Sequence, residues 1–206
     1  DLQTGQVLKT LADHFRDVTT VAFTPDSQLV VSGSKDRTVK VWNVSSGQLL
    51  TTLSAGSGMI RSVAVSPNGQ ILASGGIDNN VYLWNLSTYK PLATLSGHFN
   101  SVNSIAMSSD GMMLASGSKD RTIKVWQLPS GKLVSTLSGH LADVNGVVFH
   151  PNNQMLVSGS SDEKVKIWQI GTGEVQSTLS GHLGAVNSVA VSLDGKTIVS
   201  GSCDKT

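Results

Sequence analysis

Tryptophan recurs through this chain of 206 residues at one fixed interval, because Trp42, Trp84, Trp126 and Trp168 are each 42 residues apart. Aspartate keeps the same interval, at Asp36, Asp78, Asp120, Asp162 and Asp204. Histidine follows it at His98, His140 and His182, and His14 lies two intervals before His98. A constant period near forty residues indicates one supersecondary unit copied along the chain. Residues present in every copy are therefore expected to serve the architecture, and residues that differ between copies are expected to carry the function.

Each unit contains four short apolar or alternating runs that are bounded by turn residues. In the first unit these runs are 18–23, 29–34, 39–42 and 49–53, and the run 7–11 is equivalent to the fourth. Runs of about five residues have the length of strands, and none has the length or the 3.6-residue period of an ordinary helix. The segments Pro67-Asn68-Gly69 and Ser109-Asp110-Gly111 between the first two runs are typical of tight hairpin turns. We therefore expect an all-β chain with one four-stranded antiparallel sheet per unit.

Such sheets, repeated at this interval, are typical of the blades of a β-propeller, because radial packing buries both faces of each sheet. The chain resembles the WD-repeat β-propeller family in motifs that recur in register: Gly97-His98, Gly139-His140, Gly181-His182, the segment 115–120 and the segment 123–126. The family is named for an aspartate after the tryptophan, and this position is Asn43, Asn85, Gln127 or Gln169 here. The family often varies this position, so the resemblance implies a propeller nonetheless.

The period also predicts the domain organisation. One propeller segment is expected over residues 1–206, with repeats at approximately 12–53, 54–95, 96–137, 138–179 and, incomplete, 180–206. Residues 1–11 are expected to form an outer strand of a preceding or closing blade. The prediction is therefore four complete blades plus partial blades at both ends. Self-association through open blade edges is expected, because unpaired edges and apolar blade faces favour it.

The resemblance implies that the repeated polar residues form structural tetrads, in which Asp accepts from His, His meets Ser, and Ser meets the indole N–H. A catalytic constellation is the alternative, but an enzyme does not need its active site in every blade. The second copy has Gly56 in place of His. We expect Asp78 and Trp84 to lose their bridge there, which would make this blade the loosest. The complete tetrads are His14 with Ser32, Asp36 and Trp42, His98 with Ser116, Asp120 and Trp126, and His140 with Ser158, Asp162 and Trp168; the incomplete ones are Ser74 with Asp78 and Trp84, and His182 with Ser200 and Asp204.

Composition excludes several classes of function. A net charge of +1 predicts no long-range attraction to nucleic acid or membranes. One cysteine, Cys203, cannot form an intramolecular disulfide or a cysteine-based zinc site. The chain has neither a metal-spaced group of ligands nor a phosphate-binding glycine motif. We therefore expect no catalytic residues, no metal and no cofactor, and we expect a cytoplasmic protein that binds neither nucleic acid nor membranes.

The differences between copies concentrate in two loops that the family places on one face of the ring. The candidate partner-binding residues there are Phe15, Arg16, Asp17, Lys35, Arg37, Phe99, Lys119, Arg121, Leu141, Asp143 and Leu183. Large apolar side chains near Lys and Arg suit a hot-spot patch for another protein. The alternative is that the Phe and Leu side chains fold down onto the adjacent strand. Phosphate is a further candidate ligand of the basic residues, although the negative charges of Asp17 and Asp143 weaken the positive electrostatic field of this face.

Three functions compete at this point. The leading hypothesis is a non-catalytic interaction scaffold that binds a protein or peptide through the loop face of the propeller. The alternative is a regulatory or sensory module of a larger signalling enzyme, such as a kinase or an NTPase. A hydrolase or lectin propeller is the third, and the chain offers little of the convergent carboxylates or aromatic sugar platforms that it would need.

Overall fold

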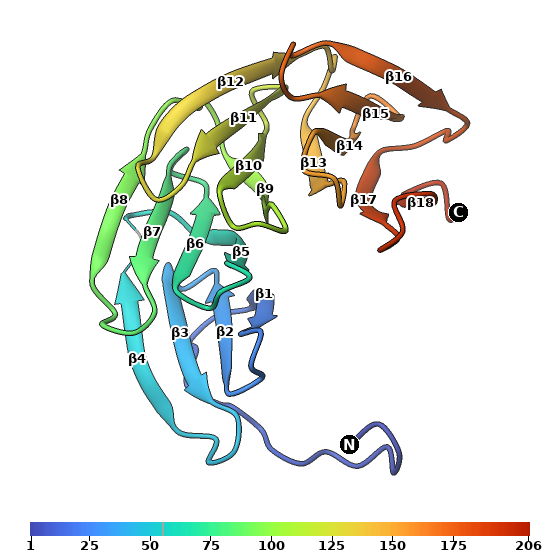
Figure 1. Ribbon diagram of the computed structural model, residues 1–206. Helices are drawn as coiled ribbons and strands as arrows, with labels where there is room; N and C mark the ends of the chain where they lie inside the picture. The colour runs from blue at the N-terminus through green and yellow to red at the C-terminus, as the bar shows by residue number, and fades with distance from the viewer. Residues whose placement is uncertain (55) are drawn as a thin grey trace.

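The computed structural model describes residues 1–54 and 56–206, in which all regular secondary structure is β-strand. Four antiparallel sheets of four strands and one sheet of two strands follow one another round an open arc (Figure 1). Within each sheet the strands are hydrogen-bonded in the order in which they occur along the chain. The predicted all-β propeller of four-stranded blades is therefore confirmed. None of the described residues belongs to a helix long and apolar enough to cross a membrane.

We number the sheets blades 1 to 5 in chain order. Blade 1 consists of β1 (Val18–Phe23), β2 (Leu29–Ser34), β3 (Thr38–Asn43) and β4 (Leu49–Ser54). Blade 2 consists of β5 (Ile60–Val65), β6 (Ile71–Gly76), β7 (Val81–Asn85) and β8 (Pro91–Leu95). Blade 3 consists of β9 (Val102–Met107), β10 (Met113–Ser118), β11 (Thr122–Gln127) and β12 (Lys132–Ser138). Blade 4 consists of β13 (Val144–Phe149), β14 (Met155–Ser160), β15 (Lys164–Gln169) and β16 (Val175–Ser180), and blade 5 of β17 (Val186–Val191) and β18 (Ile198–Ser202).

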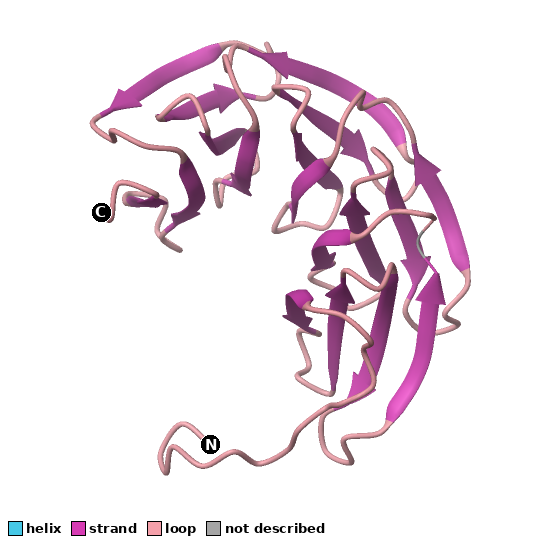
Figure 2. Ribbon diagram, turned by 180° about the vertical axis from the view of Figure 1, so that it is seen from behind, coloured by secondary structure: helices cyan, strands magenta, loops and turns pink. Residues whose placement is uncertain are grey.

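The first strand of every blade lies on the inside of the arc, and the fourth strand of blades 1 to 4 lies on its outer rim (Figures 1 and 2). Because each blade is an up-and-down meander, its connections alternate between two ends. The loop that enters the first strand and the turn between the second and third strands share one end of the blade. The other two turns share the opposite end. This topology brings loops distant in sequence onto one face of the arc.

The core lies between neighbouring blades. Val31 and Val39 of blade 1 are fully buried against Leu72 and Ile60 of blade 2, and equivalent apolar layers fill the next three junctions. Burying one such side chain contributes about 1.5–3 kcal/mol to the stability of the folded chain. The blades approach so closely that a Cβ added at Gly117 would lie 2.8 Å from Val144 Cγ1 of the next blade. The stability of each blade therefore depends on its neighbours, as expected for a repeat array.

The segment before blade 1 departs from the sequence prediction. A strand was expected over residues 7–11, but residues 5–14 contain no strand, so that prediction was wrong. The physical reason is that an outer strand needs a neighbour to pair with, and in the part of the chain that the structure describes none lies beside it. Leu11 still lies against Gly47 of blade 1 much as Leu95 lies against Gly131 of blade 3. The assignment of residues 1–11 to another blade stays a prediction.

Apolar side chains are exposed on both sides of the opening of the arc. Val21 and Phe23 of blade 1 are 66% and 61% exposed, and Val199 of blade 5 is 61% exposed. The equivalents of Val21 and Val199 at the interior junctions, such as Val63 and Val157, are buried. Self-association through these faces stays a prediction.

Candidate functional site

The candidate site is the end of the blades that carries the entry loops and the turns between second and third strands. We call this surface the loop face. In blade 1 it comprises residues 13–17 and 35–37, and the equivalent described residues are 56–59 and 77–79, 97–101 and 119–121, 139–143 and 161–163, and 181–185 and 203–205. A polar network beneath the loop face joins the entry loop to the turn in blades 1, 3, 4 and 5.

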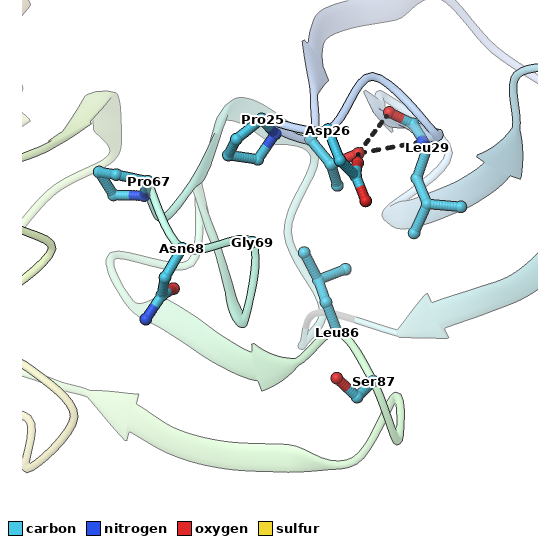
Figure 3. A pocket seen from close by; sticks show the side chains of 9 residues that line it. Pro25, Asp26, Leu29, Pro67, Asn68, Gly69, Leu86 and Ser87 are labelled. Atoms are coloured by element: carbon cyan, nitrogen blue, oxygen red, sulfur yellow. Dashed lines mark hydrogen bonds between the residues drawn. The ribbon is translucent and has the colours of Figure 1, made fainter.

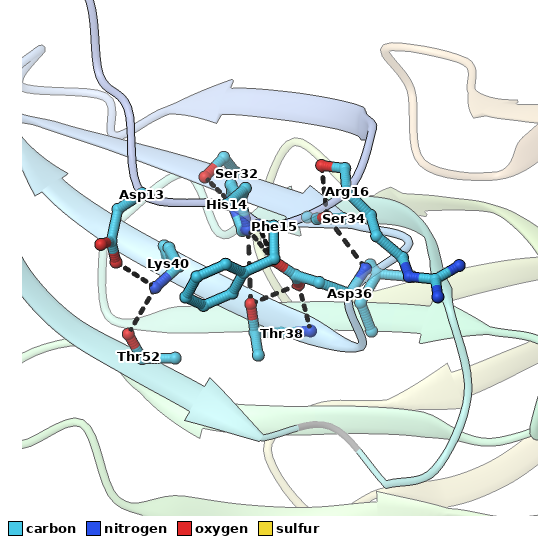
Figure 4. Close-up of polar contacts among 12 residues, drawn as sticks. Asp13, His14, Phe15, Arg16, Ser32, Ser34, Asp36, Thr38, Lys40 and Thr52 are labelled. Atoms are coloured by element: carbon cyan, nitrogen blue, oxygen red, sulfur yellow. Dashed lines mark hydrogen bonds and ion pairs between the residues drawn. The ribbon is translucent and has the colours of Figure 1, made fainter.

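In blade 1 the network connects four side chains in one chain of hydrogen bonds. Figure 4 shows three of them, His14, Ser32 and Asp36. His14 Nδ1 lies 2.7 Å from Asp36 Oδ2, and His14 Nε2 lies 2.7 Å from Ser32 Oγ. The indole Nε1–H of Trp42 donates to the same Ser32 Oγ at 2.8 Å. The His14 and Asp36 side chains are only 5% and 7% exposed. Buried polar groups need such partners, and a connected network satisfies all four.

Blades 3 and 4 repeat this arrangement in full. In both blades His Nδ1 lies 2.7–2.8 Å from the Asp carboxylate and His Nε2 lies 2.8 Å from Ser Oγ. The indole Nε1–H of Trp126 donates to Ser116 at 2.9 Å, and that of Trp168 donates to Ser158 at 2.7 Å. The structure thus brings together the side chains that the sequence placed in each set, which are His98, Ser116, Asp120 and Trp126 in blade 3 and His140, Ser158, Asp162 and Trp168 in blade 4.

Blade 5 has three of the four side chains. His182 Nδ1 lies 2.8 Å from Asp204 Oδ2, and His182 Nε2 lies 2.8 Å from Ser200 Oγ. Among the described residues no indole donates to Ser200, and Ser200 is half-buried, whereas Ser116 and Ser158 are fully buried. Ser200 therefore departs from the buried, doubly bonded serine that a complete structural tetrad requires. The physical reason is that the described part of blade 5 has two strands, so neither a third strand nor a tryptophan covers Ser200.

The tetrad carboxylates of blades 1, 3 and 5 each accept four hydrogen bonds. Asp36 Oδ1 accepts from the backbone N–H and the hydroxyl of Thr38, and Asp36 Oδ2 accepts from His14 and from the backbone N–H of Phe15. Burial alone would raise the pKa of Asp36, but the hydrogen bonds from Thr38, His14 and Phe15 outweigh it and hold the pKa well below its ordinary value. The carboxylate is therefore ionised and fully engaged, and it has no acceptor site left with which to act as a general base.

In the His140–Asp162 pair of blade 4, the histidine is the uncharged partner at neutral pH. Burial lowers the pKa of His140 below its ordinary value of 6.5, although the Asp162 carboxylate opposes the shift. Burial also acts to raise the pKa of Asp162, but bonds from the Leu141 N–H and from His140 lower it overall. At neutral pH, His140 therefore donates from Nδ1 to an ionised Asp162 and accepts at Nε2.

Blade 2 replaces the histidine in a way that the sequence pattern did not predict. Asp78 and Trp84 were expected to lose their bridge because residue 56 is glycine, and Ser74 Oγ, the serine of that bridge, has no partner among the described residues. The Tyr82 hydroxyl instead donates to Asp78 Oδ2 at 2.9 Å. The sequence reasoning missed this new donor, which a second substitution supplies to Asp78. Tyr82 stands where the other complete blades have Lys40, Lys124 and Lys166, and this change of residue type was the signal to follow.

The compensation in blade 2 is incomplete. Ser74 Oγ is buried and, among the described residues, has no hydrogen-bond partner. The Tyr82 hydroxyl also fills the space in front of Asp78, and a Cβ added at Gly56 would collide with both Asp78 Oδ2 and Tyr82 Oη. Glycine is needed for a further reason, since Gly56 has a φ of +63° in the left-handed region.

The residue after each tetrad histidine projects from the loop face into solvent. Phe15 and Phe99 are both 89% exposed, Leu141 is 80% exposed and Leu183 is 86% exposed. The alternative that these side chains fold onto an adjacent strand is therefore not what the structure shows. Their backbone N–H groups donate to Asp36, Asp120, Asp162 and Asp204 at 2.9–3.1 Å. The tetrad thus fixes the backbone of the residue whose side chain it leaves exposed.

The charged residues of the loop face are partly paired with one another. Lys35 Nζ lies 2.7 Å from Asp17 Oδ2, and Lys119 Nζ lies 3.6 Å from Asp143 Oδ2. Both pairs are solvent-exposed, so they contribute little stability. For Arg16, Arg37 and Arg121, no ion pair is found within residues 1–54 and 56–206.

No other part of the described chain offers comparable chemistry. The described residues hold no group of three His, Cys, Asp or Glu side chains arranged for a metal ion. A hollow of about 300 Å³ lies at the opposite end of the blades, between Pro25 of blade 1 and Pro67 of blade 2 (Figure 3). Its Asp26 carboxylate already accepts from Thr24 and Gln28 of its own turn. No reactive groups converge in this hollow.

Comparison with known proteins agrees with this geometry. A family model described as WD domain, G-beta repeat matches residues 5–43, 47–85, 89–127, 131–169 and 173–206. WD repeat-containing protein 18 of Danio rerio is 44% identical over 46 residues, which are 22% of this chain and 11% of that protein. Pre-mRNA-processing factor 19 homolog 2 of Arabidopsis thaliana is 48% identical over 42 residues, 20% of this chain and 8% of that protein. The Periodic tryptophan protein 2 homolog of Schizosaccharomyces pombe is 44% identical over 45 residues, 22% of this chain and 5% of that protein. Each match thus covers about one repeat and a small part of the relative's length.

Proposed function

The chain belongs to the WD40 repeat family, and on this basis we propose that it is a non-catalytic scaffold that binds a protein or peptide partner through its loop face. One observation carries the proposal. Phe15, Phe99, Leu141 and Leu183 are at least 80% exposed at equivalent positions of four blades. Exposed large apolar residues gathered on one surface mark interaction sites, because covering them with a partner removes apolar area from water.

The polar network supports a scaffold rather than an enzyme. The His, Ser and Asp side chains are used to hold the loops, and the Asp36 carboxylate is filled by its own donors. The residues left free for contact are apolar or cationic, as in the centre and rim of a protein interface. The plant relative is named for pre-mRNA processing and the other two for their repeats or tryptophans. These names do not favour the alternative of a sensory module of a kinase or NTPase.

The test replaces the four apolar loop residues together. Ser57 is the natural residue of blade 2 at this position, so Phe15, Phe99, Leu141 and Leu183 are all changed to Ser. Tagged protein is used to recover partners from an extract of the source organism. Because hot-spot truncations each cost about 1 kcal/mol or more, we expect partner recovery to fall at least about tenfold. The melting temperature should stay unchanged, since these side chains contribute little to the core.

A matched control exposes the same chemistry on the other face. Met112 and Leu193 are 55% and 98% exposed and lie in turns at the opposite end of the blades. A variant with Met112→Ser and Leu193→Ser should recover the partner as the natural chain does. Equal recovery by the natural chain and the loop-face variant would contradict the proposal. A cytoplasmic location, the lack of a cofactor and the lack of nucleic-acid binding stay predictions.

A further inference from the structure

Blades 1 and 3 carry the same side chains on the loop face, and the other blades do not. The shared residues are Phe15 and Phe99 after the histidine, Lys35 and Lys119 before the tetrad Asp, and Arg37 and Arg121 after it. The equivalent residues are Ser57, Ile77 and Asn79 in blade 2, Leu141, Ser161 and Glu163 in blade 4, and Leu183, Cys203 and Lys205 in blade 5. We infer that blades 1 and 3 form two equivalent binding sites for one partner that presents two like segments, each with an apolar and an anionic side chain. The inference rests on the proposed function and specifies its partner.

The two sites present their side chains from the same backbone geometry. The N–H groups of Phe15 and Phe99 donate to the tetrad carboxylates at 3.1 and 3.0 Å. Arg37 and Arg121 have φ values of 73° and 71°. The aromatic and cationic side chains therefore leave each blade from the same two points of a rigid turn. A segment that fits one site fits the other for the same reason.

The guanidinium groups are the cations that remain free at both sites. Lys35 and Lys119 already face Asp17 and Asp143. The carboxylates next to the arginines are also taken, because Asp36 and Asp120 each accept four hydrogen bonds from other donors. In the described chain no acid pairs with Arg37 or Arg121. A guanidinium fork in this position suits a carboxylate or a phosphate on the partner.

The turn that carries these arginines has a left-handed backbone at the residue after the tetrad Asp. A left-handed backbone favours glycine or asparagine and disfavours a long side chain. Blade 2 has Asn79 at the same position, with a φ of 69°. Asparagine therefore satisfies this turn, yet blades 1 and 3 both carry arginine. Glu163 of blade 4 and Lys205 of blade 5 have φ values of 69° and 74° at the same position, so the left-handed backbone belongs to the turn of every blade, and only the residue type distinguishes blades 1 and 3.

Blade 2 separates the two sites and lacks their side chains. Ser57 and Asn79 replace the aromatic and the cation, so the loop face offers two discrete patches and not one continuous strip. A partner that spans blade 2 would occupy the second patch at high effective concentration after it has bound the first. Linked binding of this type strengthens the complex by about 100- to 10,000-fold over one site alone.

The test places a photoreactive group in each site of the full chain. p-Benzoylphenylalanine is introduced in place of Phe15 or of Phe99, and in a control in place of Leu193 on the opposite face. After irradiation in an extract of the source organism, the cross-linked peptides are identified by mass spectrometry. We expect both loop-face positions, and not residue 193, to capture the same polypeptide through segments of like sequence that contain an anionic residue. Capture at only one position, or of unrelated polypeptides, would overturn the inference and leave the proposed function standing. No capture at either position would overturn both.

The role of the arginines is tested with substitutions that suit the backbone. Arg37→Asn and Arg121→Asn imitate Asn79 and remove the charge without straining the turn. Each single change should lower recovery of the partner about 100-fold, because the chain then binds through one site. Unchanged recovery by the double variant would refute the ionic part of the inference. Phosphatase treatment of the extract distinguishes the two anions, since it abolishes capture of a phosphate and leaves capture of a carboxylate unchanged.

Discussion

The altered network of blade 2 gives the sharpest prediction about stability. Gly56 and Tyr82 replace the His and Lys of the other complete blades, and the Tyr82 hydroxyl takes the place of the imidazole on Asp78. If the two substitutions compensate for each other, then changing both back should cost far less than the sum of the single changes. The double variant is Gly56→His with Tyr82→Lys.

The structure sets the size of each effect. In Gly56→His alone, the new side chain collides with Tyr82 and Asp78 and must adopt a left-handed backbone. We expect a loss of about 2–4 kcal/mol, from about 1–2 kcal/mol of backbone strain and the broken Tyr82–Asp78 hydrogen bond. Tyr82→Lys alone removes that bond, but the introduced ammonium group can reach Thr94 as Lys40 reaches Thr52 at 3.1 Å. Its expected cost is about 1–2 kcal/mol.

The double variant can rebuild the tetrad. The new histidine would then form a hydrogen bond with Ser74 Oγ, which lacks a partner among the described residues. We therefore expect a net loss of only about 1–2 kcal/mol, which is the backbone strain that the histidine at position 56 retains, and this is a coupling of about 2–4 kcal/mol between neighbouring sites. Urea unfolding followed by far-ultraviolet circular dichroism measures all four proteins. A double variant as unstable as the sum of the two single variants would refute the compensation.

Three further predictions concern the other blades. Asp13 Oδ2 lies 2.5 Å from Lys40 Nζ in blade 1, and Gly97→Asp would give Lys124 of blade 3 an equivalent carboxylate. This change should stabilise the chain by about 0.5 kcal/mol at low salt and by less at 1 M NaCl, where the ion pair is screened. A stability gain that does not depend on salt in urea unfolding would contradict this prediction. Asp120→Asn should cost about 2–3 kcal/mol in the same assay, because an amide cannot accept from all four donors around Asp120, whereas Arg121→Asn should not destabilise the chain. Stability should be highest above pH 7 and should fall as pH drops below 6.5, since the lowered pKa of His140 means that the unfolded chain binds the proton first. A second loss should begin as pH falls towards 3.8, because the pKa of Asp162 is also lowered. Thermal melting of His140→Gln should lose part of the first step and show a weaker second step, since His140 also helps to lower the pKa of Asp162.

Most of the fold follows from the sequence because the repeat is strict. The period of 42 residues aligns turn residues and apolar runs in every copy, so the strands of blade 1 were predicted to within one residue at each end. The exception is residues 7–11, whose alternating pattern indicates a strand but cannot supply the neighbour that a strand requires. Pairing depends on what lies beside a segment in space, and a local pattern does not contain that information.

The candidate site was less predictable from the sequence, for two physical reasons. The pattern marks Gly56 as a missing histidine, but only the geometry shows that the Tyr82 hydroxyl reaches the space left beside Asp78. Similarly, the sequence leaves open whether Phe15 and Phe99 cover a strand or face solvent. The structure decides this because the tetrad carboxylate binds their N–H groups and directs the side chains outwards.

In blades 1, 3, 4 and 5 the polar network also holds the exposed loop residue through which we propose that a partner binds. Amide hydrogen exchange at Phe15, Phe99, Leu141 and Leu183 tests it most directly, because their N–H groups donate to tetrad carboxylates although the side chains are at least 80% exposed. We predict exchange at least about tenfold slower at these amides than in an unstructured peptide. Asp120→Asn should speed exchange at Phe99 while leaving Leu183 in blade 5 unchanged. Exchange at the unstructured rate in the natural chain would contradict the account.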